Sequence, residues 1–141
     1  FKSCTGLQQV LVGEGVQTIG ESAFESCKAL QRIVFKGNTV TSIGEKAFYE
    51  CDTLDGVTIP SSVTEIGSFS FAGCDALSEI TVPDSVTELG AASFYNCRAL
   101  SKAVIGNGID KLSQVTVFLF TVAEVRNMEQ VCLKNVLILQ L

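Results

Sequence analysis

The sequence predicts an α/β repeat solenoid, a right-handed coil with a short parallel β-sheet on one face and single helical turns. Three observations support this prediction. Cysteines recur every 23 or 24 residues, a phenylalanine lies three places before each of them, and a leucine lies three places after. No such unit buries its apolar face alone, so the units must stack. The three columns are Phe1, Phe24, Phe48, Phe71 and Phe94; Cys4, Cys27, Cys51, Cys74 and Cys97; and Leu7, Leu30, Leu54, Leu77 and Leu100.

Each unit holds one short segment with the pattern of a half-buried β-strand, because alternate residues are apolar and β-branched residues are frequent. Pro60 and Pro83 end two of these segments, since proline cannot donate a hydrogen bond to a ladder. One unit holds an extra residue, which predicts a small bulge at Gly37 and Asn38. The predicted strands are 10–12, 33–35, 57–59, 80–82 and 103–105.

A second apolar pair follows each strand and predicts another short extended piece. In four units a glycine comes next, and we expect it to adopt a positive φ at the corner of the coil. A small residue, the Phe and the Cys then follow at helical spacing, so one helical turn would direct all three inward. The apolar pairs are Val16 and Ile19, Val40 and Ile43, Val63 and Ile66, Val86 and Leu89, and Ile109 and Leu112; the glycines are Gly20, Gly44, Gly67 and Gly90.

These columns resemble the BspA-like class of leucine-rich repeats, which is found on surface proteins of bacteria and some protists. The resemblance covers about residues 1–112. It implies a leucine-rich-repeat solenoid that acts in adhesion or protein recognition at a cell surface or after secretion, and it brings no catalytic residues. The fullest copy of the family pattern is Val57-Thr58-Ile59-Pro60, Val63-Thr64-Glu65-Ile66-Gly67 and Phe71-Ala72-Gly73-Cys74.

The pattern ends at Leu112, which divides the chain into repeats over 1–112, about five coils, and a hydrophobic tail over 113–141. The tail fits a degenerate sixth coil, a cap on the last coil, or a non-native end. Charged residues interrupt its apolar runs, so no span of about 18 residues remains and we expect no membrane insertion. Those charges are Glu124, Arg126, Glu129 and Lys134.

Composition excludes several classes of function. The net charge of −5 argues against binding to nucleic acid, which requires a basic surface, and against docking on anionic lipid. The chain has no His, which removes His-dependent acid–base catalysis, catalytic triads and His metal ligation. We therefore expect no enzymatic activity, no cofactor and no metal. Because the sequence begins inside a repeat, we expect a fragment of a longer array, and its start says nothing about the compartment.

The six cysteines allow two interpretations. Six in a secreted domain are enough for three disulfides. Five of them, however, share one repeat position beside an inward Phe and Leu, which favours reduced thiols packed in the core as small apolar groups. Structural zinc needs closely spaced Cys pairs, which are absent here. Cys132 stands alone in the tail.

The residues between the inward positions of the strands should point to solvent and form two columns on the sheet. Isolated charges beside an apolar, β-branched stripe are typical of a protein-recognition patch, although ordinary solvated strands have the same composition. We expect a protein or glycan ligand on this face; the alternative is a structural spacer with no ligand. The candidate residues are Gln9, Leu11, Arg32, Val34, Thr58, Glu79, Thr81, Lys102 and Val104.

Two smaller features keep two interpretations each. Tyr49 and Tyr95 are either exposed aromatic anchors or residues packed between coils. Thr41, Thr64 and Thr87 form either a hydroxyl ladder or a set of β-branched residues suited to an extended chain. The oligomeric state stays open.

Overall fold

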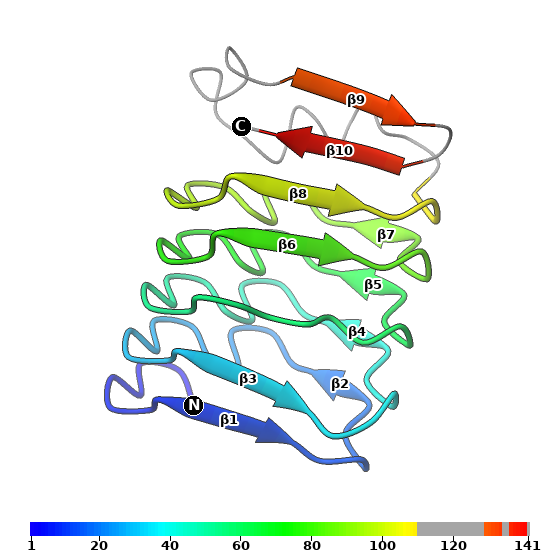
Figure 1. Cartoon of the computed structure of the whole chain (residues 1–141). Helices are drawn as coiled ribbons and strands as arrows, with labels where there is room; N and C mark the ends of the chain where they lie inside the picture. The colour runs from blue at the N-terminus through cyan, green and yellow to red at the C-terminus, as the bar shows by residue number, and fades with distance from the viewer. Residues whose placement is uncertain (110–128, 134–135, 141) are drawn as a thin grey trace.

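The computed structural model describes residues 1–109, 129–133 and 136–140. The chain winds into a stack of coils, most of which contribute a strand to the face seen in Figure 1, and a row of shorter strands lies behind that face. The N-terminus lies at one end of the stack, and the two C-terminal strands lie at the other (Figure 1). This arrangement is the solenoid that the repeat predicted.

Parallel pairs of strands form the front of the stack. β1 (Gln9–Val12) pairs with β3 (Arg32–Phe35), and β6 (Glu79–Val82) pairs with β8 (Lys102–Ile105). In both pairs a residue lies opposite the residue of the same repeat position. We number the coils by these strands: β1, β3, the segment 56–59, β6 and β8 mark the first to fifth coils, and their solvent side is called the strand face.

The end of the chain adds two antiparallel strands to the fifth coil. β10 (Val136–Gln140) pairs antiparallel with β8 and with β9 (Glu129–Leu133). A further coil of the same kind would instead pair in parallel. The other residues of the tail, including Leu112 and most of the segment 113–141, lie outside the described residues.

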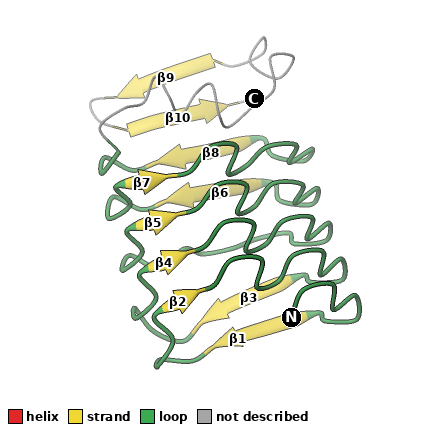
Figure 2. Cartoon of the chain, turned by 180° about the vertical axis from the view of Figure 1, so that it is seen from behind, coloured by secondary structure: helices red, strands yellow, loops and turns green. Residues whose placement is uncertain are grey.

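The second extended pieces form a sheet of their own on the back of the stack (Figure 2). Its parallel strands are β2 (Thr18–Ile19), β4 (Ser42–Ile43), β5 (Glu65–Ile66) and β7 (Glu88–Leu89). Unlike the front, this ladder runs without a break from the first coil to the fourth. The sequence predicted the extended pieces but not their pairing.

The threonine column beside this sheet is a hydroxyl ladder. The hydroxyls of Thr41, Thr64 and Thr87 donate to main-chain carbonyls of the neighbouring coil, at oxygen–oxygen distances of 3.2 to 3.3 Å. These distances exceed the usual 2.5–3.0 Å range for O–H···O bonds, so each bond is weak. The β-branched side chain and the hydroxyl therefore both suit the position.

The core consists of the repeat columns stacked along the solenoid. The rings of Phe24, Phe48, Phe71 and Phe94 are buried, and consecutive centroids lie 5.2 to 5.6 Å apart in stacked geometry. Phe1 extends the stack at 5.5 Å but is 77% exposed. The leucine column from Leu30 to Leu100 and the inner strand residues complete this core. Burial of the Phe, Cys and Leu columns confirms the inward direction predicted for them.

Four thiols of the cysteine column are buried and donate to carbonyl oxygens of the phenylalanine column. Cys51 Sγ lies 3.2 Å from the carbonyl oxygen of Phe24, and Cys27, Cys74 and Cys97 repeat this contact at 3.1 to 3.3 Å. The prediction of a reduced core ladder is confirmed for Cys27, Cys51 and Cys74, and Cys97 is buried at the same repeat position. The prediction is wrong for Cys4, which is exposed because the described chain packs nothing on its outer side.

The described residues contain no α-helix, so the predicted single helical turns are wrong. The phenylalanine segments are tight turns instead: the amide of Cys27 donates to the carbonyl of Phe24 at 3.1 Å, three residues back. The amide of Phe24 leaves its own coil and donates to Ala47 at 2.8 Å. Ser22 and Ser26 adopt positive φ values of 53° and 58°, which a right-handed helix does not permit. This part of the chain also forms no helix that could span a bilayer.

The repeated glycine serves a different purpose from the predicted one. None of Gly20, Gly44, Gly67 and Gly90 has a positive φ, so that prediction is wrong. A Cβ on Gly67 would lie 2.5 Å from the amide nitrogen of Glu45 in the neighbouring coil, and Gly44 and Gly90 are equally crowded by backbone. Glycine is needed in the stacked coils because their main chains approach each other too closely for a side chain.

Candidate ligand-binding face

The structure aligns the predicted outward residues in two columns on the strand face. All of them are exposed except Val34 and Val104, which are partly buried. The geometry therefore agrees with the alternation read from the sequence, while a role in binding stays a prediction. Paired across the ladders are Gln9 with Arg32, Leu11 with Val34, Glu79 with Lys102, and Thr81 with Val104; Thr58 lies in the third coil.

The third coil departs from this ladder. Its segment 57–59 was predicted as a strand, and it forms none. A single parallel bridge between Arg32 and Gly56 joins this segment to β3. The front of the solenoid is therefore divided into a β1–β3 pair and a β6–β8 pair, with the third coil between them as an unpaired trace (Figure 1).

Two prolines account for the break. Where the ladder is intact, the amides of Lys36 and Gly106 each donate to a carbonyl of the preceding coil at 2.9 Å. The third and fourth coils have Pro60 and Pro83 at the same repeat position, and proline has no N–H to donate. Gly56 weakens the strand further, because it has no side chain to pack. We call the boundary between β3 and residues 57–60, where this pairing is missing, the open seam.

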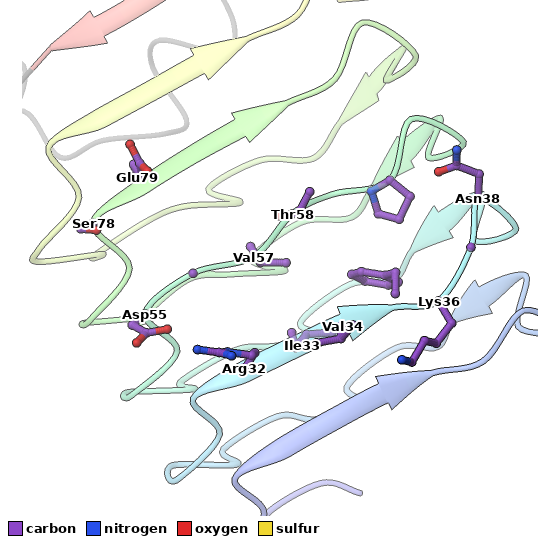
Figure 3. A pocket seen from close by; sticks show the side chains of 14 residues that line it. Arg32, Ile33, Val34, Lys36, Asn38, Asp55, Val57, Thr58, Ser78 and Glu79 are labelled. Atoms are coloured by element: carbon purple, nitrogen blue, oxygen red, sulfur yellow. The ribbon is translucent and has the colours of Figure 1, made fainter.

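A groove of about 680 Å³ lies over the open seam. β3 and the bend after it form one wall, the third coil forms the other, and the start of β6 lies at one end (Figure 3). Four of the predicted residues line it, namely Arg32, Val34, Thr58 and Glu79. The other five, Gln9, Leu11, Thr81, Lys102 and Val104, are not part of its lining.

The sequence analysis missed several residues that also line the groove, among them Lys36, Asn38, Asp55, Val57 and Ser78. The extra residue of the second coil was the available signal. The chain bends at 36–38, as the predicted bulge requires, and this bend is part of the groove wall. Lys36, Asn38, Asp55 and Ser78 lie outside the predicted strand segments, and alternation along 57–59 gave Val57 as an inward residue.

The two basic residues of the groove form no ion pair within the part of the chain that the structure describes. Neither Arg32 nor Lys36 has a carboxylate oxygen within 4.0 Å among the described residues, and both are exposed. Every other lysine or arginine with a described side chain is in an ion pair. Those paired residues are Lys2, Lys28, Lys46, Arg98 and Lys102.

Acidic groups are also present at the groove. Asp55 lines it near Arg32, and Glu79 lines it from the start of β6 (Figure 3), where it lies 4.0 Å from Lys102. At the other end, the side chain of Glu14 lies against Gly37. The groove is therefore polar at both ends and apolar in its middle, where Val34 and Val57 lie.

The remaining candidates lie elsewhere. Tyr49 is partly buried, and burial raises the pKa of its hydroxyl; Tyr95 is 44% exposed, and neither tyrosine lines the groove. Burial raises the pKa of the Cys51 thiol to about 12 and that of Cys74 well above its ordinary value. Such thiols are protonated at neutral pH and are poor nucleophiles. Within the described chain, no three His, Cys, Asp or Glu residues are grouped to hold a metal ion.

A family model of the BspA type leucine rich repeat region, in six copies, matches residues 1–121. The chain belongs to the BspA-type leucine-rich repeat family. The matched range extends beyond residues 1–112, over which about five coils were predicted, and its end, 110–121, lies outside the described residues. No curated protein gives a significant match to the sequence.

Two solved structures share the BspA-type architecture. A leucine-rich repeat protein of T. pallidum is 34% identical with a TM-score of 0.69, over 72% of this chain and 47% of that protein. A leucine-rich repeat protein of Bacteroides ovatus is 33% identical with a TM-score of 0.68, over 74% of this chain and 26% of that protein. This chain therefore spans about half or less of these relatives.

Proposed function

We propose that this BspA-type chain is a non-catalytic binding module of a cell-surface or secreted protein, and that it holds a protein or glycan ligand on its strand face. The observation that supports this proposal most strongly is the groove over the open seam, with two exposed basic residues that have no ion pair. Membership of the BspA-type leucine-rich repeat family, together with the similarity to two solved leucine-rich repeat proteins, supports a binding or structural role. The proposed surface location rests on the family alone.

A binding screen tests this function. The full chain, labelled for biolayer interferometry, is presented to extracellular-matrix proteins, host surface proteins and a glycan array. A variant with Arg32, Val34, Glu79 and Lys102 changed to Ala removes four candidate side chains from the strand face. A matched control changes exposed residues on the back of the solenoid, namely Gln17, Glu65 and Glu88, to Ala.

We expect a ligand that the strand-face variant no longer binds and the back-face variant still binds. A ligand retained by the strand-face variant would place the site elsewhere and contradict the proposal. If a folded, monomeric sample binds nothing, a structural spacer becomes the better account of the chain.

A further inference from the structure

We propose that the groove over the open seam binds an extended acidic peptide with the pattern acidic–x–apolar–x–acidic, whose carboxylates pair with Arg32 and Lys36. This inference rests on the proposed binding function and specifies its ligand. Four steps lead to it: the unpaired charges, their spacing, the free main-chain groups, and the absence of a platform for sugars.

The charge pattern points to an anionic ligand. The chain has 15 acidic and 10 basic residues, so carboxylates are in excess. Every described basic side chain except those of Arg32 and Lys36 forms an ion pair with a carboxylate. Arg32 lies in β3, and Lys36 comes directly after the end of this strand. A carboxylate beside each of them would form the same kind of charge-assisted hydrogen bond that the other basic residues make within the chain. Because Asp55 lines the groove beside Arg32, we expect Lys36 to contribute more of the attraction.

The spacing of these groups matches an extended peptide. Arg32, Val34 and Lys36 occupy alternate positions, so the two basic residues lie four residues apart, or about 13 Å at the rise of a β-strand. Side chains on one face of an extended ligand repeat at the same interval. A peptide alongside β3 would therefore present a carboxylate, an apolar side chain and a second carboxylate to these three residues.

The main chain of the third coil offers further partners. Thr58 and Ile59 make no main-chain hydrogen bond with the neighbouring coils in the part of the chain that the structure describes. Thr58 is exposed at the groove, so water satisfies its amide and carbonyl until a ligand replaces it. A peptide main chain has the complementary donors and acceptors at the same repeat distance.

A peptide fits this groove better than a glycan does. Sugar rings commonly stack on exposed aromatic faces, and the large exposed aromatic residues of the described chain are Phe1 and Tyr95. Neither of them lines the groove, and the aromatic residue that does, Phe35, is partly buried and packs against the core. Val34 and Val57 also line the groove, and they suit a small aliphatic side chain.

Fluorescence anisotropy with the full chain tests the inference. The probe is a fluorescein-labelled peptide, Glu-Thr-Val-Thr-Glu, at low salt. One control peptide has the same composition with adjacent carboxylates, Glu-Glu-Val-Thr-Thr, and another reverses the charge, Lys-Thr-Val-Thr-Lys. The protein variants are Arg32→Gln, Lys36→Gln and Gly56→Phe. The last of these fills the groove from a position where an added Cβ has no atom within 4 Å. Lys28→Gln is the matched control, because Lys28 is exposed, paired with Asp52 and outside the groove.

We expect saturable binding that Lys36→Gln weakens about threefold to tenfold, Arg32→Gln weakens less, and Gly56→Phe abolishes. Lys28→Gln should leave it unchanged, added salt should weaken it, and both control peptides should bind at least several-fold more weakly. Equal binding of the two Glu peptides, or no effect of Lys36→Gln, would overturn the inference.

A uronic-acid oligosaccharide separates this inference from the proposed function. If the sugar binds, the peptide does not, and Lys36→Gln removes the sugar, then the peptide is the wrong ligand while the strand face remains a binding surface. If neither probe binds, the acidic-peptide inference fails, and the broader screen decides the binding function independently.

Discussion

Replacing Gly67 by alanine tests the close contact between coils. A Cβ at this position would lie 2.5 Å from the amide nitrogen of Glu45, and 2.6 Å from the carbonyl carbon of Gly44. These are main-chain atoms, which cannot rotate away as a side chain can. The two coils must therefore separate locally, and the hydrogen bond from the Gly67 amide to the carbonyl of Ile43, now 2.7 Å, must lengthen.

The expected loss of stability combines these two effects. Overpacking a tightly packed interior costs about 1–3 kcal/mol, and a weakened main-chain hydrogen bond adds about 1 kcal/mol. Alanine returns roughly 0.5–1 kcal/mol, because it restricts the unfolded chain more than glycine does. We therefore expect Gly67→Ala to lower the free energy of unfolding by about 1.5–3 kcal/mol.

Urea denaturation followed by circular dichroism measures this change, with the slope of the transition checked for constancy. Gly20→Ala is the matched control at the same repeat position, because its added Cβ has no atom within 4 Å. Gly56→Ala is a second control in a central coil, with the same open surroundings. We expect both controls to raise the free energy of unfolding by roughly 0.5–1 kcal/mol, because alanine restricts the unfolded chain and nothing crowds its Cβ. If Gly20→Ala and Gly67→Ala lose the same amount, then backbone conformation and not crowding explains the glycine column, and our reasoning is refuted.

Three further predictions concern buried side chains. Ser70→Ala should raise the free energy of unfolding by about 1 kcal/mol, because the Ser70 hydroxyl is buried without a hydrogen-bond partner among the described residues. Alanine fits here, since Ala47 occupies the same repeat position in the preceding coil. An unchanged urea midpoint would contradict this prediction. Iodoacetamide should modify Cys4 in the folded chain and leave the four buried cysteines of the column intact, as peptide mass spectrometry can show. The raised pKa of Cys51, about 12 against 9.0, means that the folded state favours the neutral thiol, so its contribution to stability is complete below pH 9 and is lost as the pH rises from 9 toward 12. Urea midpoints between pH 8 and 10.5 should therefore fall less steeply in a Cys51→Ala variant than in the original chain.

The inward columns could be predicted from the sequence because the same apolar residue is buried at the same position in successive coils. Phe48, Cys51 and Leu54 are all fully buried, and their counterparts in the other coils differ little in size or polarity. The type of turn between them could not be predicted in the same way. A Phe and a Cys three residues apart suit a helical turn and a tight β-turn equally. The tight turn forms because the amide of Phe24 donates to a carbonyl of the neighbouring coil and not to one within its own turn. That choice depends on stacking, which a single repeat does not encode.

The candidate site was predictable only in part for a related reason. Alternation along the strands gave Arg32 and Val34 correctly as outward residues. The sequence also indicated Pro60, but only as the end of a strand. Its missing amide also weakens the pairing of the segment before it, and one bridge at Gly56 joins the third coil to β3. The effect of a proline on pairing depends on which carbonyl of the neighbouring coil its position faces, and the sequence alone does not show this. Lys36 lies one residue beyond the predicted strand 33–35, at the start of the bend, so the strand prediction did not include it, although its amide still donates to the carbonyl of Val12 at 2.9 Å.

The unequal pairing of the two sides of the solenoid also has a mechanical consequence. On the back, β2, β4, β5 and β7 form a continuous ladder, while the front ladder stops on both sides of the third coil. Hydrogen bonds between coils therefore resist bending on the back and are almost absent on the front at this coil. We expect the stack to bend at the third coil, with the front opening and the back ladder acting as the hinge. Paired spin labels on the second and fourth coils should then show a broader distribution of distances than labels on the fourth and fifth. A ligand seated across the gap would narrow that distribution, and capture of a partner would thereby stiffen the molecule.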